Sequence, residues 1–136
     1  MKHPERVEDY LEHIAQAIER ATGYVQRFDS VEALQKDQQV QDAVIRNIEI
    51  IGEAASRIQK QAPEFVTAHP ELPWIEMRGM RNKMIHNYFD VSLTVVWNTI
   101  KDNLPRLKQQ WTLTRHNMER HAPCLKLHVT RPPLFM

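Results

Sequence analysis

The sequence predicts an all-α protein, an up-and-down bundle of four to five helices. Apolar residues recur at steps of three and four along several long segments, whereas no segment of useful length alternates with the period of a strand. The chain has only 3 glycines in 136 residues, and β-sandwiches and nucleotide-binding folds need glycine at their turns. The length suits a single hydrophobic core. We therefore expect one helical domain.

The first expected helix covers residues 5–28. Its apolar positions form one continuous stripe at helical spacing: Val7, Leu11, Ile14, Ile18, Ala21, Val25 and Phe28. Asp29 or Ser30 is suited to cap a short helical piece that follows, and Glu32 stands three residues after Asp29 in the spacing of a capping box. A short capped helix is therefore expected between the first two long ones.

The second long helix is expected from about Asp37 to Gln61, since its apolar residues again step by three or four. Pro63 should end it, because proline cannot continue a helix without losing a hydrogen bond. Residues 63–73 contain three prolines and are predicted to form a loop with about one turn of helix.

A third helix is expected to start at Pro73, with Trp74, Met77, Met84 and Tyr88 on one stripe. The methionines at 77, 80 and 84 are interpreted as core residues. Asp90 is suited to cap a fourth helix that reaches Trp111, and Pro105 should kink that helix.

The helical periodicity ends after Trp111, so residues 1–111 are predicted to form the bundle and residues 112–136 a basic extension. That extension carries four basic residues and one acidic residue, although the whole chain has a formal net charge of only +1. Cys124 is the only cysteine, which excludes an internal disulfide. The sequence shows neither a signal peptide nor a run of about 18 apolar residues, so we expect a soluble cytoplasmic protein.

Arg81, Asn82 and His86 are the polar residues of the third helix that suggest chemistry. Arg81 falls within the apolar stripe, where an unpaired guanidinium would be costly to bury. Asn82 and His86 share a face, but Arg81 and His86 diverge by about 140° around an ideal helix. Either the helix loosens near Asn87, or a second chain completes the site across a two-fold axis.

These residue types suit phosphate chemistry. Arginine neutralises a phosphoryl group, asparagine orients it, and histidine titrates near neutrality as a general acid or base. Metal-free RNA cleavage by the 2′-hydroxyl needs such groups, although the spacing alone also fits an unspecialised helix end. The histidines at 116, 121 and 128 lack the spacing of a metal site, so no metal and no cofactor are expected.

The segment from Arg81 to Tyr88 resembles the Arg-x-x-x-x-His-x-Tyr motif of HepT-like toxins in the HEPN superfamily. The surrounding stretches agree with that resemblance, which covers about residues 5–111. They read AVIRNIEIIGEAA at 43–55, LPWIEMRGMRNKMIHNYFDVS at 72–92 and VWNTIKDNLPRL at 96–107.

The resemblance implies a HEPN-like bundle that forms a homodimer or larger oligomer, and a metal-independent endoribonuclease that acts as the toxin of a toxin–antitoxin pair. Arg81 and His86 match the catalytic pair, and Asn82 matches the polar position that follows the motif arginine. Tyr88 matches the tyrosine to which an MNT-type nucleotidyltransferase antitoxin adds AMP. Such an adduct would place a phosphate beside Arg81. On its residues alone, Tyr88 also fits the amphipathic end of an apolar stripe.

A second class of function stays open. The same helices could belong to a non-catalytic nucleotide-binding or assembly subunit that holds a nucleotidyltransferase partner. Arg81 and His86 would be present in either case. RNA and the nucleotidyltransferase are therefore the expected partners, a membrane is not expected, and the role of residues 112–136 is left open.

Overall fold

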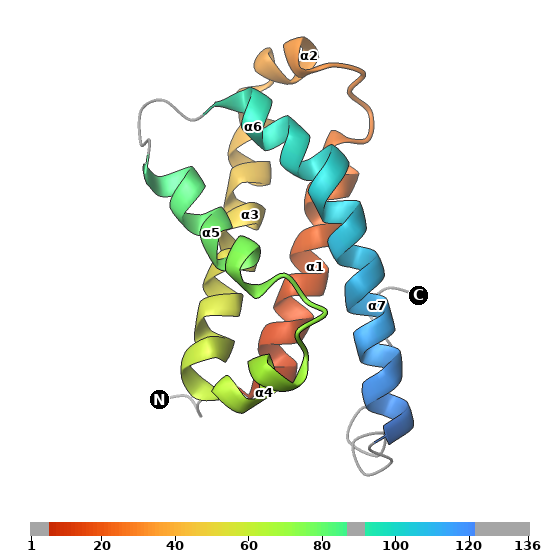
Figure 1. Cartoon of the computed structure of the whole chain (residues 1–136). Helices are drawn as coiled ribbons and strands as arrows, with labels where there is room; N and C mark the ends of the chain where they lie inside the picture. Colours follow the sequence, from red (N-terminus) through yellow and green to blue (C-terminus); the bar gives the residue numbers. More distant parts are fainter. Residues whose placement is uncertain (1–5, 87–91, 122–136) are drawn as a thin grey trace.

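The computed structural model describes residues 6–86 and 92–121, and every regular element in these ranges is a helix (Figure 1). The predicted all-α class is confirmed. The elements are α1 (Val7–Val25), α2 (Val31–Gln35), α3 (Gln38–Gln61), α4 (Pro63–Ala68), α5 (Trp74–His86), α6 (Leu93–Asn98), the π-helix η1 (Thr99–Asn103) and α7 (Leu104–His121).

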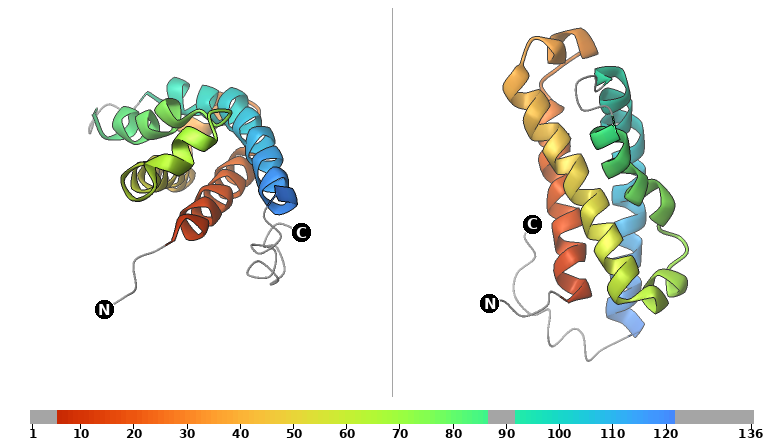
Figure 2. Two further views of the ribbon diagram at one scale, coloured as in Figure 1. Left: turned by 60° about the horizontal axis from the view of Figure 1, so that its bottom comes forward. Right: turned by 90° about the vertical axis from the view of Figure 1, so that its left-hand side faces the viewer.

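The long helices run up and down and pack in two layers (Figure 2). Helices α1 and α3 are antiparallel neighbours in one layer, and α3 also packs against α5. The continuous rod of α6, η1 and α7 lies across α1 and beside α5 in the other layer. Helix α5 is therefore an outer helix of the bundle.

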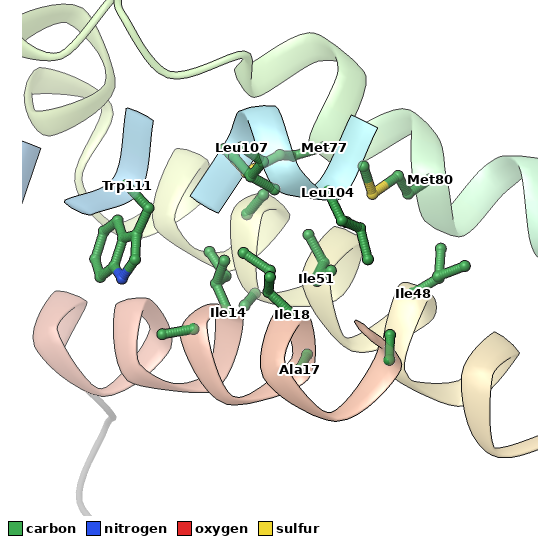
Figure 3. Close-up of a cluster of buried hydrophobic side chains, with 14 of the residues drawn as sticks. Ile14, Ala17, Ile18, Ile48, Ile51, Met77, Met80, Leu104, Leu107 and Trp111 are labelled. Atoms are coloured by element: carbon green, nitrogen blue, oxygen red, sulfur yellow. The ribbon is translucent and has the colours of Figure 1, made fainter. Parts of the chain in front are cut away.

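The core fills the space between the two layers, and Figure 3 shows its central side chains. Helix α1 contributes Ile14 and Ile18, and α3 contributes Ile48 and Ile51, all nearly or fully buried. Met77 and Met80 of α5 and Leu104, Leu107 and Trp111 of α7 close the core from the other side. The stripes expected from the sequence therefore meet as one cluster, and the core assignment of Met77 and Met80 is confirmed.

Side-chain caps set several helix starts. Ser30 accepts a hydrogen bond from the Ala33 N–H at 3.3 Å and is the cap of α2, so of the two expected candidates Ser30 takes the role. Asp37 caps α3 through the Val40 N–H at 3.1 Å, and the helix begins close to the expected place. Pro63 opens α4 after ending α3, which fits its fixed φ and missing N–H.

The start of the fourth helix differs from the expectation. Helix α6 begins at Leu93, and the Ser92 hydroxyl accepts a hydrogen bond from the Val95 N–H at 3.3 Å. Asp90, the expected cap, lies outside the described residues. Serine competes well with aspartate at this position because its hydroxyl reaches the same orphan N–H groups.

Pro105 acts on this rod through a π-helical turn. The Leu104 N–H donates to the carbonyl of Thr99, five residues back, and η1 ends at Asn103, two residues before the proline. Proline has no N–H and its ring collides with the carbonyl four residues before it, so a wider turn at this place relieves the collision. The disturbance expected at Pro105 therefore takes the form of η1.

Helix α7 continues to His121, well past the boundary expected after Trp111. Thr114 is fully buried and Met118 packs against the core cluster, so the stripe of α7 continues beyond Trp111. The sequence concealed this continuation because a threonine occupies the central buried position. Within the ranges given above, no helix is both long and apolar enough to span a bilayer.

Candidate active site

The start of α5, the helix that carries the expected motif, is fixed by backbone hydrogen bonds. The Met77 N–H donates to the carbonyl of Pro73 at 2.9 Å, so the proline stands immediately before the first helical residue. The Trp74 N–H donates to Leu72, and the indole Nε1 of Trp74 donates to the carbonyl of His69, both at 2.9 Å. The preceding loop therefore determines where α5 begins.

Aromatic contacts reinforce this anchor. The Phe65 ring of α4 lies 4.3 Å from the His69 ring, measured between centroids, and 6.1 Å from the Trp74 ring in an edge-on arrangement. Edge-to-face and offset pairs of this kind add to the stability gained by burying the rings. The loop between α4 and α5 is thus held by side chains at both of its ends.

Glu71 connects the same loop to α7. Its Oε2 accepts a hydrogen bond of 2.8 Å from the Thr114 hydroxyl and lies 3.2 Å from Nδ1 of His69. Partial burial opposes ionisation of this carboxyl, but hydrogen bonds from its own backbone N–H, from Thr114 and from His69 outweigh that effect and lower the pKa of Glu71. The ionised carboxylate therefore stabilises the anchor of α5.

The inward face of α5 is apolar. Trp74, Met77 and Met80 are buried, and Met77 and Met80 lie on the side of α5 that faces the core (Figure 3). Arg81 follows Met77 by one turn, so its place in the helix register falls on this inward side.

The outward face of α5 is unusually bare. Ile75 is 75% exposed, and a Cβ placed on Gly79 would meet nothing within 4 Å. Asn82 is exposed on the same face. Ile75, Gly79, Asn82 and the register position of His86 follow one another at steps of four, three and four, so they form a single stripe.

The structure places the expected site residues as follows. Arg81 and His86 belong to α5, which is a regular α-helix through His86, but their side chains lie outside the described residues. Tyr88 lies outside them entirely. Because the helix stays regular between Arg81 and His86, their register positions remain about 140° apart. The described part of α5 therefore shows no departure from a regular α-helix that would bring the positions of Arg81 and His86 to the same side.

One polar residue of α5 escaped the sequence reading. Arg78 is half-buried, and its Nε is buried without a hydrogen-bond acceptor. The sequence feature that could have identified Arg78 is its position three residues, or about one turn, before Arg81 on the motif helix. No group of three or more potential metal-ligating residues occurs in the part of the chain that the structure covers.

Comparison with known proteins supports the resemblance found in the sequence. The sequence model of a family described as ribonuclease HepT-like matches residues 14–112. A HepT protein of Thermococcus cleftensis, described as a probable ribonuclease, is 44% identical over 107 residues, which cover 79% of this chain and 94% of the relative. A candidate RNase of Caldanaerobacter subterraneus is 42% identical over 105 residues, covering 74% of this chain and 87% of that protein. No solved structure gives a significant match.

Proposed function

Because this chain belongs to the ribonuclease HepT-like family, we propose that it is a metal-independent endoribonuclease and the toxin of a toxin–antitoxin pair acting in the cytoplasm. The observation that carries the proposal is the family match over residues 14–112, which includes all of α5 and both motif residues, Arg81 and His86. The relatives of similar length named as ribonucleases support the same activity.

The proposed reaction uses the substrate's own nucleophile. The 2′-hydroxyl of the RNA attacks the adjacent phosphorus, the bond from phosphorus to the 5′-oxygen breaks, and the products carry a 2′,3′-cyclic phosphate and a 5′-hydroxyl. His86 serves as general base or acid, moving the proton from the 2′-oxygen or to the departing 5′-oxygen. Arg81 stabilises the charge on the phosphorane, and Asn82 positions the phosphate.

We propose further that two copies of the chain form the site. The register of α5 separates Arg81 from His86 around the helix, so an active cleft needs Arg81 of one copy and His86 of the other. The bare outward stripe of Ile75, Gly79 and Asn82 supports a close approach of the second copy, because it offers apolar surface and no side chain at its centre.

The catalytic roles are tested by incubating RNA with the purified protein in EDTA. Wild type should release fragments ending in a 2′,3′-cyclic phosphate, and Arg81→Ala and His86→Ala should each reduce the rate by at least about a hundredfold. Arg20→Ala and His116→Ala change the same residue types at exposed positions of α1 and α7 and should leave the rate unchanged. Full activity in either motif variant would refute the assignment. RNA left intact by wild type would favour the assembly-subunit alternative.

Tyr88 is the proposed site of control by an MNT-type nucleotidyltransferase. Its register on a continued α5 would be about 20° from Arg81, so an adenylyl group on the phenol oxygen would bring a phosphate to the motif arginine. Co-expression with that antitoxin should raise the mass of the chain by one or more adenylyl units on Tyr88 and abolish cleavage. Tyr88→Phe should stay toxic and escape neutralisation. An unmodified chain, with Tyr88→Phe neutralised as well as wild type, would instead indicate occlusion by the antitoxin.

A further inference from the structure

Arg78 of α5 is a cation without a counterion among the described residues. Its side chain is half-buried, its Nε is inaccessible to solvent, and none of its nitrogens has a hydrogen bond or ion pair with a residue that the structure describes. Three other arginines, Arg27, Arg46 and Arg57, lie 2.9, 3.8 and 3.0 Å from carboxylates. Burying a charged donor without an acceptor costs free energy, so the fold keeps Arg78 at some expense in stability.

The position of Arg78 relates it to the motif. Arg78 precedes Arg81 by three residues, which corresponds to a rise of about 4.5 Å and a rotation of about 60° on an α-helix. Met80, which is buried in the core, lies on nearly the opposite side of α5 from Arg78. Arg78 thus lies at the edge of α5, about 60° around the helix from the register position of Arg81, which falls on the inward side.

We propose that Arg78 binds a backbone phosphate of the RNA next to the one that Arg81 contacts. The proposal rests on the ribonuclease function proposed above and adds a binding residue outside the motif. With Nε enclosed, the two Nη groups are the accessible end of the side chain, and both are donors suited to phosphate oxygens. A phosphate there would supply the anion that the folded chain lacks.

The chemistry favours a backbone phosphate over a base. A guanidinium on a helix edge contributes charge and donors without an aromatic platform, and such contacts hold the strand in register without reading sequence. Because the phosphate contact releases a counterion, it should also appear in the salt dependence of binding. Arg78 is therefore a substrate-binding residue, whereas the chemical step stays with Arg81 and His86.

The test measures fluorescence anisotropy of a labelled single-stranded RNA over a series of salt concentrations, in a His86→Ala background that prevents cleavage. Arg78→Gln should weaken binding roughly tenfold at low salt and reduce the slope of log affinity against log salt by about 0.7. Arg78→Lys should keep most of that slope, because the positive charge stays. Arg20→Gln, with the same charge change on an exposed residue of α1, should alter neither quantity.

Thermal unfolding of the same variants separates binding from a structural role. Since Arg78→Gln removes an unpaired half-buried charge, its melting temperature should equal or exceed that of the parent while affinity falls. An unchanged salt slope, an absence of RNA binding by the parent, or a loss of stability that parallels the loss of affinity would each overturn the inference. If wild type cleaves RNA but Arg78→Gln leaves the salt slope of binding unchanged, only the role of Arg78 is rejected. If binding depends on Arg78 but wild type does not cleave RNA, only the ribonuclease function is rejected.

Discussion

Glu71 illustrates how one carboxylate can fix the position of a functional helix. The Thr114 hydroxyl of α7 is fully buried and donates to Glu71 in the loop that anchors α5. Thr114→Val keeps the shape and removes the donor, so it should lower the free energy of unfolding by about 1 kcal/mol. Thr112→Val is the matched control, because the Thr112 hydroxyl is exposed and donates only to the Lys108 carbonyl of its own helix. Equal effects of the two substitutions in chemical denaturation would contradict the anchor.

The same carboxylate should make stability depend on pH. Because the pKa of Glu71 is lower in the folded chain than its ordinary value of 4.5, its contribution is fully present above that value and disappears as pH falls through the folded-state pKa. The difference in unfolding free energy between wild type and Glu71→Gln should therefore shrink at acidic pH. Denaturation at several pH values from about 3 to 7 measures it, and a constant difference would exclude this linkage.

At the scale of the helix, the effect of Gly79 on stability should differ between a single chain and a dimer that packs against α5. Glycine inside a helix costs about 1 kcal/mol relative to alanine, and the space for a Cβ is open in the single chain. Gly79→Ala should therefore stabilise a chain kept monomeric by Ile75→Lys. In the otherwise wild-type chain it should weaken dimerisation and cleavage, if a second copy packs on this stripe. A stable, fully active Gly79→Ala dimer would place the interface elsewhere.

The helices show where sequence periodicity is sufficient. The ends of α3 could be predicted because Asp37 and Pro63 act locally, through a cap and a missing N–H. The length of α7 could not, because burial of Thr114 depends on Glu71, 43 residues away in the chain. Arg78 was overlooked for a related reason, since only the folded chain shows that it lacks an acceptor. The motif residues themselves could be named from the sequence, but their catalytic roles stay predictions.

For the whole molecule, the position of α5 on the outside of the bundle connects the fold with the proposed site. The helix buries Met77 and Met80 inward, whereas on its outer face Ile75 and Asn82 are exposed and the space beside Gly79 is open. One regular helix cannot turn Arg81 and His86 toward the same phosphate. A two-fold axis near α5 would overcome this separation, because Arg81 of one copy could then face the same phosphate as His86 of the other copy.

That arrangement predicts complementation between two inactive variants. Arg81→Ala and His86→Ala homodimers should each be inactive, but exchange between them creates mixed dimers in which one chain keeps Arg81 and the other keeps His86. If the site takes these residues from different chains, random exchange should restore up to about one quarter of wild-type activity, because half of the dimers are mixed and half of their sites are intact. The mixture is assayed on RNA in EDTA after dissociation and reassembly, with each variant reassembled alone as the control. If one chain supplied both residues, no dimer in the mixture would contain an intact site, because every chain lacks either Arg81 or His86. A mixture that stays inactive while light scattering confirms exchange would therefore exclude the composite cleft.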